Sequence, residues 1–132
     1  MKKLSIGAIS LGISVLLLAG CGVLTSSGMK CKYTDEDGKQ SVMYIKDNML
    51  YSEAAQSGMN IKGLSRDNKF YIWSDTEAQG MMVDLTTNQD IKINETPITS
   101  TKDMITEIQK HSTCTAENVA DTLFQVPTDK TF

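Results

Sequence analysis

The chain has 132 residues, a formal net charge of −3 and 40% hydrophobic residues. This length fits a single domain with a modest core. Because its 13 lysines and arginines form no basic stripe, we expect no nucleic-acid partner.

The first twenty residues have the pattern of an export signal. Lys2 and Lys3 give a positive start, and the uncharged run 4–19 that follows is apolar with small residues mixed in. A membrane-spanning helix needs about 20 mainly apolar residues, and this run is shorter and diluted by glycine and serine. A charged start, a short apolar stretch and small residues at its end are typical of a signal peptide.

The end of this signal, Leu18-Ala19-Gly20-Cys21, resembles the lipobox of bacterial lipoproteins. The resemblance implies that Cys21 becomes the lipid-modified first residue of the mature chain, carrying fatty acyl groups such as palmitate. The chain would then be anchored at the extracytoplasmic face of the cell membrane or the outer membrane. The alternatives are an ordinary secretory signal with a chance cysteine, or an uncleaved anchor helix. The expected organisation is a signal peptide over 1–20, a Gly- and Ser-rich tether over 21–28 and one β-rich domain over 29–132.

Two cysteines remain in the mature chain, Cys31 and Cys114. Disulfides persist outside the cytosol, so an even pair near the two ends of one exported domain predicts a disulfide bond. The alternative is two separate free thiols.

Short alternating runs with turn residues between them follow from residue 29 to residue 94. The turns contain Asp, Asn and Gly, as in Asp35-Glu36-Asp37-Gly38 and Asp47-Asn48. A spacing of about ten residues predicts an antiparallel sheet of about seven strands. The expected strands are 29–34, 40–46, 49–54, 59–64, 69–74, 81–85 and 91–94.

The pattern changes to helical after Pro97. Ser100 to Asp103 fits a capping signal, and Met104, Ile105 and Ile108 follow at helical spacing, which predicts an amphipathic helix over 101–110 that packs on the sheet. A second helical turn or two within 117–124 is a weaker prediction. The fold class expected is therefore mainly antiparallel β (α+β), with one packed C-terminal helix.

The segment from Tyr44 to Leu85 resembles envelope proteins of the LolA/LolB-like class in its order of strands and turns. The pieces that carry the resemblance are Tyr44-Ile45-Lys46-Asp47-Asn48-Met49, Lys69-Phe70-Tyr71-Ile72-Trp73 and Gly80-Met81-Met82-Val83-Asp84-Leu85, with Phe124-Gln125-Val126-Pro127 near the end. The resemblance implies a curved, half-barrel-like sheet with a helix over its concave face. In carriers of that class, the space between sheet and helix holds acyl chains. No binding residue of the class can be transferred to a position of this chain.

Four apolar side chains are candidates for contact with such a ligand: Trp73, Tyr71, Met82 and Met43. Methionine is flexible and is common on surfaces that bind varied apolar partners. In alternating strands Tyr71 and Trp73 share one face, and Met82 is expected to be more exposed than Met81. The alternative is that these residues only fill the core.

The sequence contains no pattern of a catalytic or metal site. His111 is the single histidine, expected to be a favourable charge near the end of the helix, and the acidic turn at 35–38 lacks the further ligands of a calcium loop. We therefore predict a non-enzymatic protein, expected to be a monomer without catalytic residues, metal or cofactor. Its partners would be the membrane, through Cys21, and an apolar ligand such as an acyl chain or lipoprotein. The alternative is an envelope-surface structural or interaction protein with a filled core and no small ligand.

Overall fold

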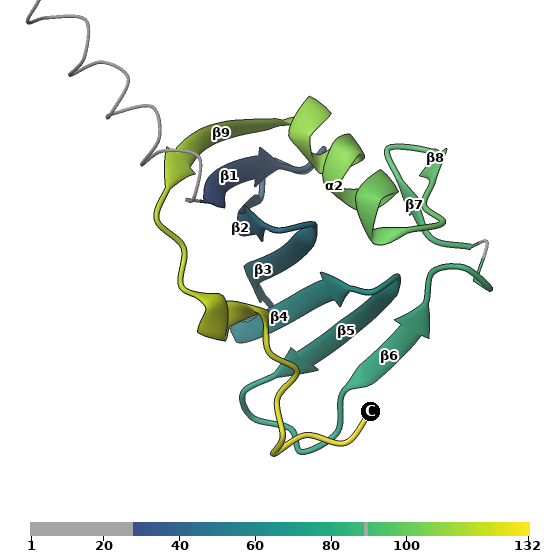
Figure 1. Cartoon of the computed structure of the whole chain (residues 1–132). Coiled ribbons are helices and arrows are strands. Elements are labelled where there is room, and N and C mark those ends of the chain that lie inside the picture. The colour runs from purple at the N-terminus through teal and green to yellow at the C-terminus, as the bar shows by residue number, and fades with distance from the viewer. Residues whose placement is uncertain (1–27, 89) are drawn as a thin grey trace, which may run out of the picture.

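The structure is a computed structural model that describes residues 28–88 and 90–132 (Figure 1). The expected signal peptide, the lipobox with Cys21 and the tether up to residue 27 lie outside the described residues. Gly28, expected at the end of the tether, is the first residue of β1 and is buried. Within the described residues no helix is both long and apolar enough to cross a membrane.

Within the described residues, the predicted antiparallel β architecture with one packed α-helix is confirmed. Seven strands form one sheet in the order β6-β5-β4-β3-β2-β1-β9, with antiparallel pairing throughout, and the sheet is not closed into a barrel. The strands are β1 Gly28–Thr34, β2 Gln40–Lys46, β3 Met49–Gln56, β4 Met59–Arg66, β5 Lys69–Ser74, β6 Met81–Asp84 and β9 Ser112–Glu117.

Tight turns fix the register of the central strands. Both central residues have positive φ in Asp47-Asn48 (48° and 60°), Ser57-Gly58 (53° and 79°) and Asp67-Asn68 (52° and 60°). Two-residue turns of this kind match the natural twist of hairpin strands, and Asn, Asp and Gly tolerate the left-handed backbone they require. The hairpins β2–β3, β3–β4 and β4–β5 therefore follow directly from the local sequence.

The last predicted strand of the sheet was wrong. Residues 91–94 were expected as a sheet strand, but β7 Lys92–Ile93 pairs only with β8 Thr96–Pro97 in a separate small hairpin. The seventh strand of the sheet is instead β9, which pairs with β1. The sequence of β9 has little apolar alternation, so its pairing comes from a distant strand and not from a local pattern. In the segment 117–124 only a short 3₁₀ helix forms, η1 Asp121–Phe124.

The helix α2 Thr101–Lys110 has the predicted bounds. The Ser100 side chain caps its start by accepting a hydrogen bond from the Asp103 backbone N–H (3.0 Å). Its apolar residues Met104, Ile105 and Ile108 are buried in a cluster with sheet residues of β1, β2 and β3. We call the sheet face beneath α2 the helix face.

The opposite face of the sheet carries a second core, which is covered by the C-terminal segment 119–132. Tyr51, Leu64 and Trp73 of the sheet pack there against Val119 and Phe124. The chain runs from β9 past η1 across β4 and β5 and ends near β6 (Figure 1). The sheet is therefore the middle layer of three, and we call this side the tail face.

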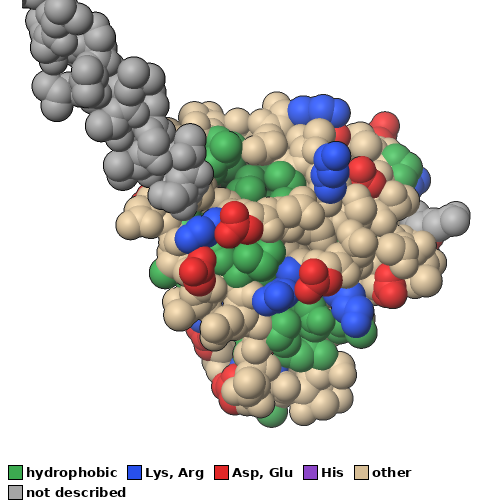
Figure 2. All heavy atoms as spheres, viewed as in Figure 1, with side chains coloured by type: hydrophobic (Ala, Val, Ile, Leu, Met, Phe, Trp, Pro, Cys, Tyr) green, Lys and Arg blue, Asp and Glu red, His purple; other side chains and the backbone are tan. Residues whose placement is uncertain are grey.

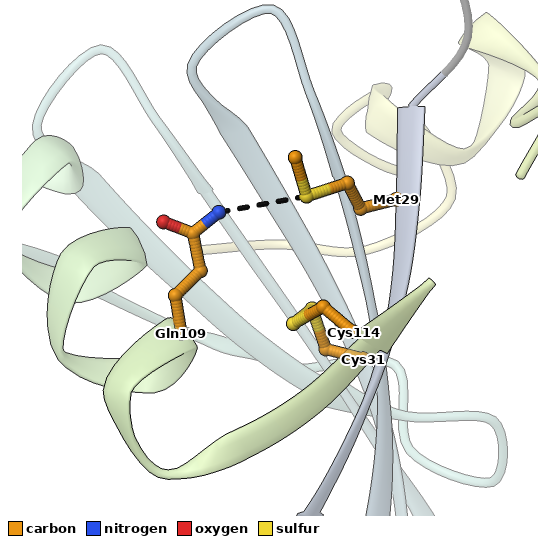
Figure 3. Close-up of a disulfide and its surroundings, with 4 residues drawn as sticks. All are labelled: Met29, Cys31, Gln109 and Cys114. Carbon is orange, nitrogen blue, oxygen red and sulfur yellow. Dashed lines mark hydrogen bonds between the residues drawn. A yellow bond between two sulfur atoms is a disulfide. The ribbon is translucent and has the colours of Figure 1, made fainter. Parts of the chain in front are cut away.

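The predicted disulfide is present between Cys31 of β1 and Cys114 of β9, which are direct register partners with Cα atoms 4.0 Å apart. It lies on the helix face, and close to it Gln109 of α2 contacts the Met29 sulfur of β1 (Nε2–Sδ 3.6 Å; Figure 3). The bond thus ties the edge strand β9 to the sheet beneath the helix.

Candidate functional site

An apolar cavity of about 360 Å³ lies on the helix face, between the sheet, α2 and the β7 segment. We call it the helix-side pocket. Most of its lining is hydrophobic, and its polar groups come from a few residues only. The lining residues are Tyr33, Met43, Leu50, Ser52, Phe70, Ile91, Lys92, Ile93, Asn94, Met104 and Ile108.

Small side chains in the middle of the sheet leave room for this pocket. Met43, Ser52 and Gly63 are neighbours in register across β2, β3 and β4 and so point to the same face. A Cβ atom at Gly63 would stand 2.7 Å from Ser52 Oγ and 3.0 Å from the Phe70 ring. Glycine at this position therefore lets the Phe70 ring lie close to the backbone of β4, where it forms a wall of the pocket.

The polar residues of the pocket belong to β1, β3 and the β7 segment. The Tyr33 hydroxyl donates a long hydrogen bond to Asn94 Oδ1 (3.4 Å). Among the described residues, Lys92 is the only charged residue that lines the pocket, and it is exposed to solvent. The pocket thus combines an apolar interior with a cation and neutral hydrogen-bonding groups in its lining.

A second cavity, of about 450 Å³, lies on the tail face and is more polar. Tyr51, Lys62, Trp73 and Asp75 line it from the sheet side, and the segment 122–130 supplies most of the other side. Lys62 and Asp75 form an ion pair across this region (2.8 Å). We call it the tail-side cavity.

Tyr51 in the tail-side cavity remains a hydrogen-bond donor at all ordinary pH values. Burial raises the pKa of its phenol well above the usual value, and the hydrogen bond that it donates to Glu53 (2.6 Å) raises this pKa further. The phenolate that a nucleophile or a base would need is therefore strongly disfavoured.

The structure separates the four predicted ligand residues onto the two faces of the sheet. Met43 lines the helix-side pocket, whereas Tyr71, Trp73 and Met82 are on the tail face. The Phe132 ring covers the two aromatic residues there, with centroid distances of 5.2 Å to Tyr71 and 6.1 Å to Trp73. Only Trp73 of these three lines the tail-side cavity.

The predicted order of exposure at the two methionines of β6 was wrong. Met81 is 60% exposed and Met82 is 41% exposed. The cause is the register, which places Met82 beside Tyr71 in the covered part of the tail face and leaves Met81 beside Ile72 at an open edge.

Figure 2 shows hydrophobic side chains in separate patches between charges of both signs on the face it displays.

Several lining residues of the helix-side pocket were not recognised as ligand candidates from sequence. The sequence patterns place Ile91 and Ile93 only in an expected strand and Ile108 only in the expected helix. The two-residue hairpin turns contained the missing signal, since they place Met43 in one row with Ser52, Gly63 and Ile72. That row excludes Tyr71 and Trp73 from the face on which Met43 lies.

His111 ends α2, and its ring Nε2 is 3.0 Å from Glu107 Oε1. Burial by itself raises the pKa of Glu107, but hydrogen bonds and charge from His111 and Lys110 outweigh that effect and lower the pKa below its ordinary value. Residues 28–88 and 90–132 contain no group of three or more His, Cys, Asp or Glu side chains arranged to hold a metal ion.

Comparison with protein-family models, with curated proteins and with solved structures finds no match for this chain. Any functional assignment therefore depends on the geometry and chemistry of the two cavities.

Proposed function

We propose that the domain is a non-enzymatic binding protein that takes an apolar ligand, such as an acyl chain, in the helix-side pocket. The observation that carries the proposal is the apolar lining of this cavity of about 360 Å³, with Met43 and Phe70 from the sheet and Met104 from α2. Small-molecule pockets usually have volumes of about 300–1,000 Å³ and a mainly hydrophobic lining with few polar groups. A volume near the lower limit suits one chain and not a bulky multi-chain lipid.

Burial of an acyl chain supplies enough free energy for measurable binding. Each buried methylene contributes about 0.8 kcal/mol, so six methylenes contribute about 5 kcal/mol before the costs of ordering the ligand. Methionines at positions 43 and 104 can adjust to chains of different length, because their side chains are unbranched and flexible. In this proposal the sheet is half-barrel-like and curves around the ligand beneath α2.

We further propose that the protein is attached to the membrane through lipid on Cys21, at the extracytoplasmic face of the cell membrane or outer membrane. The disulfide Cys31–Cys114 supports this location, because such bonds persist mainly in oxidising compartments. Mass spectrometry of protein from its own host tests the anchor. An unmodified Cys21 or a retained Met1 would contradict it.

Ligand binding is tested with a fluorescent fatty acid and the full-length chain carrying Cys21→Ser, which removes the lipid acceptor. In Ser52→Leu, the larger side chain occupies the pocket, and we expect affinity to fall at least about tenfold, equal to about 1.4 kcal/mol. Met82→Leu, on the tail face, is the matched control and should bind as the parent does. Thermal unfolding of both variants verifies that they are folded.

Two results would overturn the proposed function. Fatty-acid binding that keeps its full affinity in folded Ser52→Leu would place the ligand outside the helix-side pocket. No binding of any fatty acid by the folded parent chain would favour the alternative, an envelope-surface interaction protein without a small ligand.

A further inference from the structure

The helix-side pocket has a chemical asymmetry that an acyl chain alone does not use. Its interior is formed by Met43, Leu50 and Phe70 from the sheet and by apolar residues of α2. Its polar lining is supplied mainly by the β7 segment, which contributes Lys92 and Asn94 and lies beside the Tyr33 hydroxyl. A ligand that fills both parts would be apolar along its length and polar at one end.

The charge in this polar part is positive. Lys92 is the only charged residue of the lining, and within residues 28–88 and 90–132 it takes part in no salt bridge. Asp90 and Glu95 are close to it in sequence, but neither lines the pocket. A cation beside an apolar cavity attracts an anionic head group and disfavours a cationic one.

Neutral groups at the same position can hold the oxygens of such a head group. The Tyr33 hydroxyl and the Asn94 side chain are joined only by a long hydrogen bond of 3.4 Å, and both residues line the pocket. A hydroxyl and an amide can each donate to a carboxylate or phosphate oxygen. Charge and hydrogen-bonding capacity therefore favour the same class of ligand.

Resting on the proposed function, we infer that the ligand is a single-chain anionic amphiphile, whose chain lies under α2 and whose head group lies at Lys92. Free fatty acids and single-chain phosphate lipids share this chemistry. Because Lys92 is exposed and solvent screens its charge, the head group contributes a selectivity of a few-fold and the chain contributes most of the affinity.

The test compares four twelve-carbon probes on the full-length Cys21→Ser chain: dodecanoate, dodecyl phosphate, dodecanol and dodecyltrimethylammonium. The first two distinguish a carboxylate head group from a phosphate head group. Calorimetry should show dodecanoate or dodecyl phosphate binding about three- to fivefold more tightly than dodecanol. The cationic probe should bind most weakly. The anion that binds more tightly shows whether the site prefers a fatty acid or a single-chain phosphate lipid.

The variant Lys92→Gln should remove the preference for the anion, so that the anions and dodecanol bind with similar affinities. Lys102→Gln, on the exposed side of α2, is the matched control and should keep the preference. Equal affinities for dodecanol and both anions, or a preference that survives Lys92→Gln, would overturn the inference and leave the proposed function intact. If none of the four probes binds, the proposed function fails, and the inference fails with it.

Discussion

The disulfide between Cys31 and Cys114 should contribute a large part of the domain's stability. It joins β1 to the edge strand β9, and it closes a loop of 84 residues, counted from Cys31 to Cys114 inclusive. Loop-closure entropy for this length corresponds to about 4.5 kcal/mol at 25 °C. Domains of this size are usually stable by only about 5–15 kcal/mol, so a loss of about 4.5 kcal/mol would remove about 30% or more of the total.

The measurement is urea unfolding of the full-length Cys21→Ser chain with and without reductant. Reduction removes only the S–S bond and leaves both cysteine side chains in place, so it changes packing little and isolates the effect of the cross-link. We expect the free energy of unfolding to fall by about 3–5 kcal/mol on reduction. The double variant Cys31→Ala/Cys114→Ala is the control, since reductant should not change its stability.

Two outcomes would contradict this reasoning. A loss below about 1 kcal/mol would show that the reduced chain keeps β9 close to β1 in the unfolded state, so that the cross-link restricts little. An equal loss in the double variant would show that the reductant acts elsewhere in the protein.

Three further perturbations test individual side-chain contacts. Thr101→Val should cost about 1–3 kcal/mol in urea unfolding, because it leaves the buried Ser65 hydroxyl without its partner at 3.0 Å; a change under about 0.5 kcal/mol would mean that this bond is not needed. Phe132→Ala should shift the fluorescence emission of Trp73, the single tryptophan, to longer wavelength, because water would reach the indole ring. An unchanged spectrum would show that the Trp73 ring is covered without Phe132. The lowered pKa of Glu107 gives stability that is present above its ordinary value of about 4.5 and is lost as pH falls through the folded-state pKa. The parent should therefore lose more stability on acidification than Glu107→Gln does, and identical pH profiles would refute the assignment.

Local patterns in the sequence were sufficient for the elements whose causes are local. The hairpin turns at Asp47-Asn48 and Asp67-Asn68 need residues that accept positive φ, and the sequence has such residues at the spacing that hairpins require. The helix start at Ser100 and its apolar stripe were equally local, so the bounds of α2 were predicted correctly. The pairing of Cys31 with Cys114 followed from the cysteine count and from the expected export signal.

Only the tertiary structure decided which segments cover which face of the sheet. The strand β9 has weak alternation and exists because β1 offers it a partner 83 residues away, and the Phe132 ring covers Tyr71 and Trp73 from the far end of the chain. Such contacts depend on how the whole chain closes around the sheet, and no short window of sequence encodes them. The strand register separates Met43 and Trp73 onto opposite faces, but only the fold shows that α2 and the β7 segment form a pocket on the Met43 face.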